Sequence, residues 1–230
     1  MDTAVLLRGD AVWSLTLLFL SLWDYVRGTR DDYALYHPRR YQREPVASDG
    51  VVQPYTDSPL DDEAVGETVY LNLINKAARY VYITPPYLII SSEMITALAT
   101  AAKSGLDVRI ITPPVADKWY VHAVTRAYYE VLIEAGVRIY EYTPGFIHAK
   151  TFTVDDEYGV VGTINLDFRS LYLHFECAAW LYRCSCIPKM REDFMQTLAV
   201  SQEVTLEECR GVGLVTRVVR SVLRVFAPLM

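Results

Sequence analysis

The stretch GFIHAKTFTVDDEYGVVGTINLD, residues 145–167, places titratable and amide side chains in what otherwise reads as an apolar hairpin. HAKTFTV and YGVVGT alternate as two strands, and the acids at 155–157 occupy the turn between them. Because alternate side chains of a strand share a face, we expect His148 and Lys150 to project from one surface. The pattern H-x-K-x4-D-x6-G-T-x-N is filled by His148, Lys150, Asp155, Gly162, Thr163 and Asn165.

This six-position pattern carries more weight than any of its members. A lone strand histidine is structural more often than catalytic, roughly four times in five. The full pattern has a chance occurrence on the order of one in ten thousand or rarer in a chain of this length. It therefore predicts a chemical site on the hairpin.

Composition limits what can surround this hairpin. With 230 residues and 52% hydrophobic content, the chain can bury a sizeable core, either as one large domain or as a small domain with attached helices. The net charge of −6 argues against a nucleic-acid coat, although a local basic patch remains possible. The four cysteines, at 177, 184, 186 and 209, match neither zinc knuckles nor a secreted disulfide framework. We expect reduced thiols in a cytoplasmic compartment.

The start of the chain predicts neither a signal peptide nor a membrane span. Its first ten residues, MDTAVLLRGD, have a charge pattern unlike a signal peptide. The apolar run at 11–23 is too short to cross a bilayer. Apolar residues at helical spacing instead predict an amphipathic helix over 10–25 with Asp10 as its N-cap.

Upstream of the hairpin, strands and helices alternate. Residues 27–54 are rich in charge, tyrosine and proline without apolar periodicity, which indicates an irregular, solvated connector. The following strand should end near Thr84, because prolines come next, and Ser92 and Gly105 can cap and end the next helix. The expected helices are 60–78, 92–104 and 118–135, and the expected strands are 80–84, 107–112 and 137–142. This alternation favours parallel strands joined by crossovers.

Downstream, HFECAAWLYR predicts another strand, the chain turns helical after Pro188, and TLEE at 205–208 has the capping-box form. In the final segment, 213–230, Arg217, Arg220 and Arg224 share one helical face and apolar residues fill the rest. Such a helix can lie in a membrane interface with its arginines at anionic headgroups. A helix that packs on the core is an equally weighted alternative.

These motifs together resemble the phospholipase D superfamily, and specifically the C-terminal half of bacterial cardiolipin synthases. The resemblance rests, in order, on TPPYLI, AAKSGLDVRIITP, EAGVRIYEYTPGFIHAK, GTINLDFRS and HFE. It implies an α/β fold, a phospholipase D-like half with a mixed central β-sheet flanked by helices on both faces. It also implies four parts: residues 1–27 as a helix left from the preceding catalytic half, 28–58 as a connector, 59–203 as the catalytic domain, and 204–230 as basic amphipathic C-terminal helices.

The activity implied by the resemblance is a phosphatidyl transfer that makes cardiolipin and glycerol from two phosphatidylglycerol molecules through a phosphohistidine. Such enzymes carry two motifs, because one imidazole cannot stand on both sides of the phosphorus. This chain has only the second, and His37, His122 and His174 lie in contexts that cannot replace the first. His148 would be the acid and then the base, although the roles could be reversed.

The resemblance also assigns the other site residues. Lys150 and Asn165 would hold the non-bridging phosphate oxygens in place of a metal ion, so we expect no cofactor and no metal. Glu176 would accept the second N–H of His148. Asp155 belongs to the catalytic motif, but a turn-fixing role is favoured about two to one. Thr163 and Tyr87 would contact substrate.

Two neighbouring features of the resemblance leave alternatives open. His174 stands where the synthases usually have asparagine. Asp167 and Arg169 match the family and would either form a supporting ion pair or contact lipid.

The partners expected from this resemblance are phosphatidylglycerol, a membrane surface bound peripherally at its cytoplasmic face, and a second motif-bearing half. That half would come from a missing N-terminal segment or from a second copy, with exposed apolar surface at the seam. No nucleic acid is expected. Two alternatives remain: a homodimeric phosphodiesterase or nuclease of the same superfamily, which the acidic charge and the C-terminal helix disfavour, and an inactive truncated half.

Overall fold

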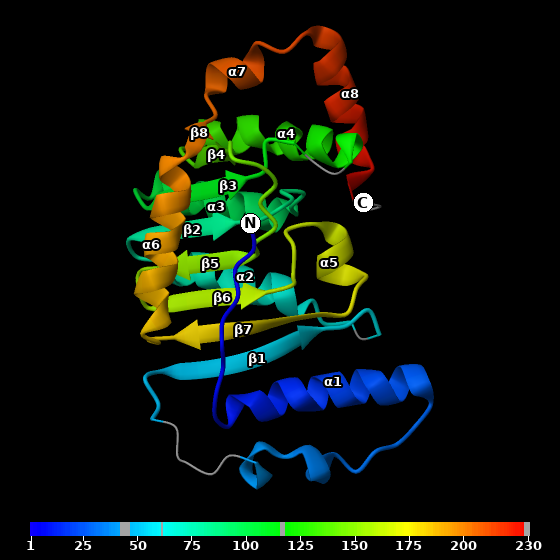
Figure 1. Cartoon of the computed structure of the whole chain (residues 1–230). Helices are drawn as coiled ribbons and strands as arrows, with labels where there is room; N and C mark the ends of the chain where they lie inside the picture. Colours follow the sequence, from blue (N-terminus) through cyan, green and yellow to red (C-terminus); the bar gives the residue numbers. More distant parts are fainter. Residues whose placement is uncertain (42–46, 61, 116–117, 228–230) are drawn as a thin grey trace.

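A single sheet organises the chain, and the computed structural model describes residues 1–41, 47–60, 62–115 and 118–227 of it. The eight strands lie in the order β1-β7-β6-β5-β2-β3-β4-β8 (Figure 1). Their bounds are β1 Val51–Asp57, β2 Tyr80–Thr84, β3 Asp107–Thr112, β4 Arg138–Tyr142, β5 Thr151–Val154, β6 Tyr158–Gly162, β7 Glu176–Tyr182 and β8 Ser201–Glu203. The strands β2, β3 and β4 are parallel, and every other pair is antiparallel. The sheet is therefore mixed, as expected.

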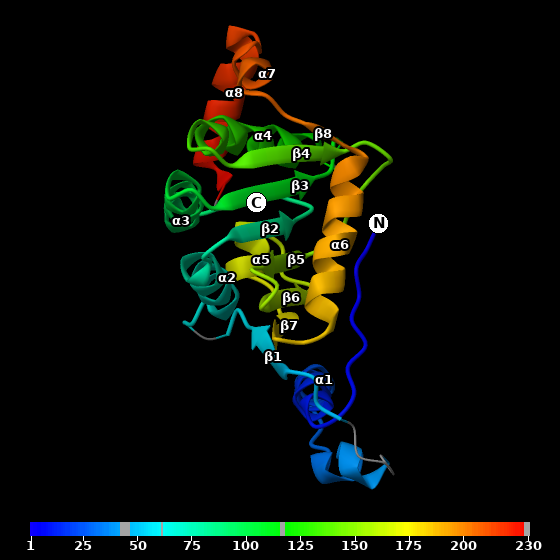
Figure 2. The ribbon, with the colours of Figure 1, turned by 90° about the vertical axis from the view of Figure 1, so that its left-hand side faces the viewer.

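Helices cover both faces of this sheet. Figure 2 shows α2 Val65–Lys76, α3 Ser92–Lys103 and α4 Trp119–Glu134 on one face, opposite α6 Cys186–Ala199 on the other. The larger apolar core lies under the first three helices, and smaller clusters lie on the α6 side. In the larger core Tyr70 of α2 stacks on Phe152 of β5 with ring centroids 4.2 Å apart. The predicted fold class is confirmed.

The remaining helices lie around the sheet. They are α1 Ala11–Arg27, α5 Phe168–Tyr172, α7 Leu206–Arg210 and α8 Leu214–Val225, with short 3₁₀ turns η1 Tyr33–Tyr36 and η2 Pro38–Arg40. The first of them, α1, runs beside β1 at one edge of the sheet, while α7 and α8 lie beyond the opposite edge (Figure 1). None of the helices in the described ranges is both long enough and apolar enough to cross a membrane.

The structure corrects several expected boundaries. The connector is not irregular throughout, because β1 forms at its end and pairs with β7. Asp10 precedes α1 but makes no side-chain capping bond, and Ser91, one residue before the expected cap, accepts from the Met94 N–H at the start of α3. Pro188 lies inside the first turn of α6, where proline costs no hydrogen bond. Residues 42–46 of the connector and 228–230 of the terminal helix are outside the described residues.

Other local expectations are confirmed. The capping box of Thr205 and Glu208 starts α7, and β2 ends at Thr84. The hairpin forms with Asp155 and Asp156 at its turn, both at positive φ, of 56° and 61°. Two consecutive residues of this conformation suit the right-handed twist of a tight hairpin. Its first strand starts at Thr151, three residues later than expected.

Candidate active site

The hairpin, the loop after it and β7 bring five of the expected site residues to one end of the sheet. Because β5, β6 and β7 are antiparallel neighbours, the start of β5, the end of β6 and the start of β7 coincide. An open cleft of about 420 Å³ lies there. Its lining comprises Asp2, Thr3, His148, Ala149, Lys150, Gly162, Thr163, Asn165 and Glu176.

His148 and Lys150 lie side by side in this cleft. The Lys150 Nζ lies 3.0 Å from Nδ1 and 2.9 Å from Nε2 of the His148 ring, and it donates to the His148 carbonyl at 2.6 Å. The two side chains therefore share one surface, as expected, although they precede the paired part of β5. The His148 side chain is 49% exposed, so its ring is accessible to a substrate.

The electrostatic environment of Lys150 favours loss of its proton. Burial lowers the pKa of this ammonium below its ordinary value, and the carboxylates of Asp2, Glu176 and Asp167 oppose the shift without cancelling it. The positive charge is thus held with less water around it than a surface lysine has. A phosphate group entering the cleft would meet a poorly hydrated cation, which strengthens their attraction.

The carboxylate that contacts His148 is not the expected one. Glu176 accepts hydrogen bonds from the Thr163 and Ser170 hydroxyls, and its Oε1 lies 3.8 Å from Nδ1 of His174. No ion pair joins Glu176 to His148 within the described residues. The His148 ring instead has Nδ1 3.4 Å from the Asp2 carboxylate.

Asn165 is tied to this network through Ser170, a residue that sequence reasoning missed. The Asn165 amide donates to Ser170 Oγ at 2.9 Å, and Ser170 Oγ donates to Glu176 at 2.9 Å. Asp167 caps α5 by accepting from the Ser170 N–H at 2.8 Å. The spacing D-x-x-S is a common N-cap pattern and could have identified this helix start.

Asp167 is the buried support of this loop. Burial raises the pKa of its carboxyl group, and the hydrogen bond from the Ser170 N–H lowers this pKa by a smaller amount. No ion pair links it to Arg169 in the described residues, and the Arg169 side chain is exposed. Of the two alternatives for Asp167 and Arg169, the ion pair is thus absent from the described residues, and Asp167 supports the loop through the α5 cap.

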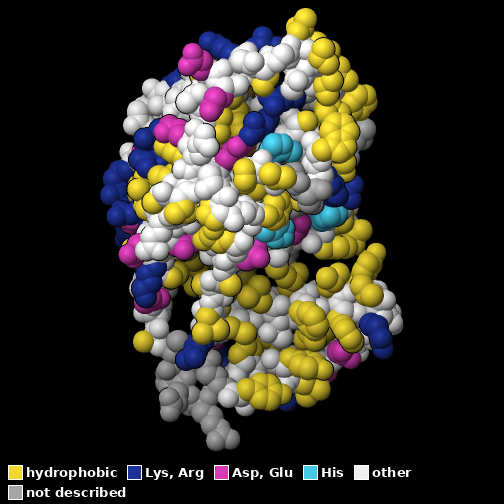
Figure 3. Space-filling model, turned by 45° about the horizontal axis from the view of Figure 1, so that its top comes forward, with side chains coloured by type: hydrophobic (Ala, Val, Ile, Leu, Met, Phe, Trp, Pro, Cys, Tyr) yellow, Lys and Arg dark blue, Asp and Glu magenta, His cyan; other side chains and the backbone are white. Residues whose placement is uncertain are grey.

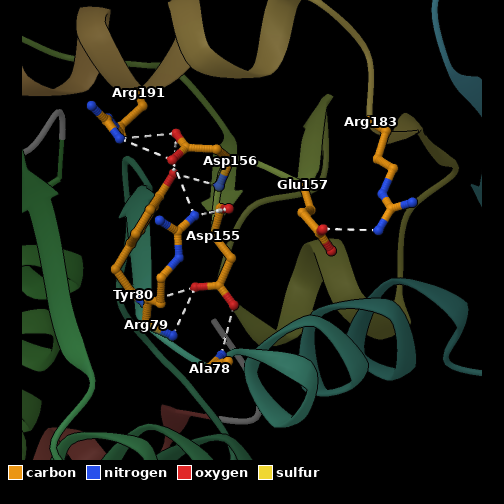
Figure 4. A network of polar contacts seen from close by, with 8 residues as sticks. All are labelled: Ala78, Arg79, Tyr80, Asp155, Asp156, Glu157, Arg183 and Arg191. Atoms are coloured by element: carbon orange, nitrogen blue, oxygen red, sulfur yellow. Dashed lines mark hydrogen bonds and ion pairs between the residues drawn. The ribbon is translucent and has the colours of Figure 1, made fainter.

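Asp155 lies at the opposite end of β5, outside the cleft. Figure 4 shows its carboxylate accepting from three consecutive backbone N–H groups, those of Ala78, Arg79 and Tyr80, at 2.6, 2.9 and 2.8 Å. These groups lie between α2 and β2, and the side chain is buried. The arrangement matches the turn-fixing interpretation.

Tyr87, the last expected site residue, lies beside the cleft loop. It precedes Leu88, which bridges Leu166, and the Ile89 N–H donates to the Leu166 carbonyl at 2.8 Å. The half-buried Tyr87 is thus held next to residues 163–167, but it is not among the residues that line the cleft.

A second cavity, of about 290 Å³, lies away from this cleft between α4, α7 and α8. Its lining includes Arg126, which is paired with Glu141 at 2.6 Å, and Arg220. Acidic side chains outnumber basic ones in this lining, so it does not resemble a phosphate site. The cleft that contains His148 and Lys150 is therefore the better candidate site.

Metal-ligating groups do not gather at either cavity. Across the described residues, no three or more histidine, cysteine or acidic side chains are placed to hold a metal ion. The four cysteines are free thiols, as expected. Burial raises the pKa of each thiol, which keeps them protonated and unreactive.

The chain matches a family model described as "Cardiolipin synthase, PLD-like domain" over residues 70–198. An uncharacterized protein of Streptococcus mutans is 46% identical over 229 residues, which cover 100% of this chain and 49% of that protein. Cardiolipin synthases of a Geobacillus species and of Halalkalibacterium halodurans are 39% and 35% identical, again over 100% of this chain and 45% of each relative. The chain thus spans about half the length of these curated relatives.

Solved structures of low sequence identity share the fold. Nuc of Salmonella typhimurium, a phospholipase D family member, superposes with a TM-score of 0.56 at 17% identity, over 67% of this chain and 97% of that one. A phosphatidylserine synthase of Haemophilus influenzae gives 0.60 at 17% identity, over 77% of this chain and 45% of that one. At this identity the likeness shows a common architecture.

Proposed function

This chain belongs to the cardiolipin synthase family of phospholipase D-like proteins, and from that membership we propose that it supplies one catalytic half of a phosphatidyltransferase. The substrate would be phosphatidylglycerol at a membrane surface, and the products would be cardiolipin and glycerol. The observation that carries this proposal is the cleft, which is open to solvent and holds one accessible imidazole beside a half-buried ammonium.

The proposed chemistry needs an imidazole on each side of the phosphorus. A nitrogen of the histidine from the other half attacks the phosphorus, and the bond to the glycerol oxygen breaks. His148, as an imidazolium, gives its proton to that oxygen as glycerol leaves. Neutral His148 then removes a proton from a hydroxyl of a second phosphatidylglycerol. The resulting oxygen displaces the histidine and forms cardiolipin, which regenerates both rings.

Lys150 and Asn165 would stabilise the charge on the non-bridging oxygens. The ammonium is the fixed cation of the cleft, and an amide nitrogen has a second hydrogen beyond the one that Asn165 gives to Ser170. Fixed donors of this kind lower the barrier without rearranging as charge develops. Glu176 would keep Ser170 and Thr163 in place, and Asp2 would orient the His148 ring.

The second motif would come from a partner half, either an N-terminal segment of a longer protein or a second copy. The chain spans 45% of the cardiolipin synthase of the Geobacillus species, which leaves room there for another half. Exposed apolar side chains on α1, among them Phe19 and Val26, at 62% and 72% exposure, are also consistent with a missing neighbour.

The test is reconstitution. The chain is co-produced with the N-terminal half of that Geobacillus relative, and labelled phosphatidylglycerol is followed by thin-layer chromatography. We expect cardiolipin and glycerol, with turnover reduced at least about 100-fold by His148→Gln, because general acid–base catalysis typically contributes that much. The matched control is His37→Gln, which should leave turnover unchanged. Plasmid nicking without lipid conversion would establish the nuclease alternative, and no turnover with any partner would favour an inactive half.

A further inference from the structure

The C-terminal helix α8 turns its apolar side away from the protein. With about 100° between successive residues, Leu214, Val218, Val222 and Val225 fall on one side, and these side chains are 77%, 53%, 52% and 76% exposed. Figure 3 shows hydrophobic side chains gathered along the part of the surface where α8 lies. A soluble helix normally places such residues against the core.

The arginines of α8 face the protein instead. Arg224 lies over the ring of Tyr128 of α4, with its guanidinium carbon 4.5 Å from the ring centroid. Arg217 lies 3.8 Å from the Glu130 carboxylate of the same helix. The half-buried Arg220 adjoins the cavity that contains Arg126. These contacts fix the rotation of α8 about its axis.

Packing within the chain accounts for little of the stability of this helix. The 12-residue α8 buries none of its residues completely, and isolated helices of this length are marginal in water. Its anchors are the arginine contacts, the partly buried Leu223 and the buried Ala227 just beyond its end. A further surface that covers the valines would stabilise it.

The start of α4 extends the apolar surface. Arg217 lies near Glu130 and Arg224 lies over Tyr128, so α8 crosses α4 with its C-terminal end toward the start of α4 (Figure 1). Trp119 begins α4 and is 72% exposed, and Phe226 at the end of α8 is exposed as well. Tryptophan with an exposed ring is typical of side chains at a membrane interface.

We infer that α8 and Trp119 form a binding surface for a bilayer that contains anionic phospholipid, and that this contact holds the cleft close to its lipid substrate. The inference rests on the proposed function for the identity of that substrate. The exposed face is aliphatic apart from Ser221, and the half-exposed Arg217 lies beside it, which is the composition of helices that lie in the interface. Figure 1 places α8 at the end of the sheet to which β6 leads, and this end holds the cleft.

A second copy of the chain fits this face less well. Pairing two α8 helices through their valines would bring the half-exposed Arg217 of each copy toward the other, and like charges across an interface are unfavourable. Anionic headgroups would instead neutralise Arg217 and the neighbouring Arg210. Arg210 is bound to the carboxylates of Glu130 and Glu134, whereas Arg217 is 3.8 Å from Glu130 alone, so the attraction should come mainly from Arg217.

The test compares two substitutions that change the charge equally. Val222→Glu introduces a carboxylate on the apolar face, and Thr216→Glu introduces the same group at an exposed position on the opposite side of α8. Flotation is measured with vesicles of phosphatidylglycerol and phosphatidylcholine, and with phosphatidylcholine alone. We expect Val222→Glu to lower the partition coefficient about tenfold or more, since burial of one such side chain is worth at least a tenfold change. Thr216→Glu should change it by less than about threefold, and the wild-type chain should prefer the anionic vesicles.

The inference would be overturned if Val222→Glu floated with the vesicles as the wild-type chain does. It would also be overturned if both variants lost the same amount of vesicle binding. If light scattering showed that the wild-type chain is a dimer and that Val222→Glu is a monomer, the face would bind a second copy and the inference would be wrong. Val215→Asn, which removes apolar surface without adding charge, repeats the test if circular dichroism shows that Val222→Glu does not fold.

Failure of the proposed function would be recognised separately. In the reconstituted enzyme with detergent-solubilised phosphatidylglycerol, Val222→Glu should keep wild-type turnover, because Val222 is remote from the cleft chemistry. If no variant gives product but Val222→Glu still loses flotation, the lipid surface stands and the proposed reaction does not. If turnover is present and flotation is unchanged, the reaction stands and the surface does not.

Discussion

At the scale of single residues, the proposed catalysis depends on the charge of Lys150. Its ammonium reaches both ring nitrogens of His148 and the backbone carbonyl of the same residue. These contacts hold the ammonium beside the His148 ring, where the phosphate would bind in the proposed reaction. They also make the protonation of Lys150 a condition for the proposed catalysis.

The pH dependence should report this ammonium. Burial lowers the pKa of Lys150, so the charged form is lost as pH rises through a value below the ordinary lysine range. We expect turnover of the reconstituted enzyme to fall on the alkaline side at a correspondingly low pH. In Lys150→Arg the cation persists to much higher pH, and the alkaline limb should move upward even if the maximal rate falls. If the alkaline limb of the pH profile does not move in this variant, it reports the titration of a group other than Lys150.

Asp155 controls stability at the far end of the same strand. Its carboxylate accepts three backbone N–H groups between α2 and β2. Asp155→Ala should lower the free energy of unfolding by about 2–4 kcal/mol, because buried donors lose a charged acceptor. Urea titration measures this loss.

A matched control for Asp155 lies in the same turn. Glu157→Gln breaks an exposed pair with Arg183, whose atoms lie 3.0 Å apart, and should cost at most about 1 kcal/mol. If Asp155→Ala instead abolished turnover while unfolding at the wild-type urea concentration, Asp155 would have a catalytic role and the turn-fixing interpretation would be wrong.

At the scale of elements, the site depends on a close approach between β6 and β7. A Cβ added at Gly162 would lie 2.3 Å from the Ala178 Cβ and 2.5 Å from the Cys177 carbonyl oxygen. Thr163 follows directly and exchanges backbone and side-chain hydrogen bonds with Cys177. The glycine therefore sets the distance between the strands that carry Thr163 and Glu176.

Gly162→Ala should accordingly force these strands apart. We expect a loss of about 1–3 kcal/mol in the free energy of unfolding, as for other overpacked sites, together with reduced turnover. Gly159→Ala on the same strand is the control, since its Cβ would meet side chains alone, the flexible Met190 at 3.3 Å and Ile187 at 3.4 Å. This variant should lose less than about 1 kcal/mol. Equal losses in urea titrations of the two variants would contradict the argument.

The elements also show how far the sequence could be interpreted. Alternating apolar runs were sufficient to predict β2 to β7, because burial dictates their periodicity. They could not reveal β1, whose sequence VVQPYTD interrupts its pattern with Pro54 and lies beside a charged connector. An edge strand tolerates proline because the backbone groups on its outer side make no hydrogen bonds to a neighbouring strand. The pairing of β1 with β7 depends on contacts distant in sequence.

The cleft shows the same limit. The motif predicted that His148, Lys150 and Asn165 would meet, since their spacing is local to one hairpin. The acceptor of the His148 ring could not be deduced, because Asp2 and Glu176 come from remote segments and their positions depend on tertiary packing. The role of Ser170 followed from the α5 cap, a local signal that was present but overlooked.

At the scale of the whole molecule, the sheet separates two exposed apolar regions. One lies on α1 beside β1, and the other lies on α8 beyond β8, at opposite edges of the sheet (Figure 1). The open cleft lies between them. This arrangement would allow a partner half and a lipid surface to bind at the same time.

The source of the second histidine can be decided by mixing. In a reconstituted enzyme that is active, intact chain and His148→Gln chain are combined at a constant total concentration, and turnover is measured against the intact fraction. If two copies form the active site, an equal mixture should retain about one quarter of the activity, because the dimers with two intact histidines scale as the square of that fraction. If a separate N-terminal half supplies the other histidine, each complex needs one intact chain, and about half of the activity should remain. A linear dependence would thus exclude the homodimer, and a quadratic one would exclude the separate half.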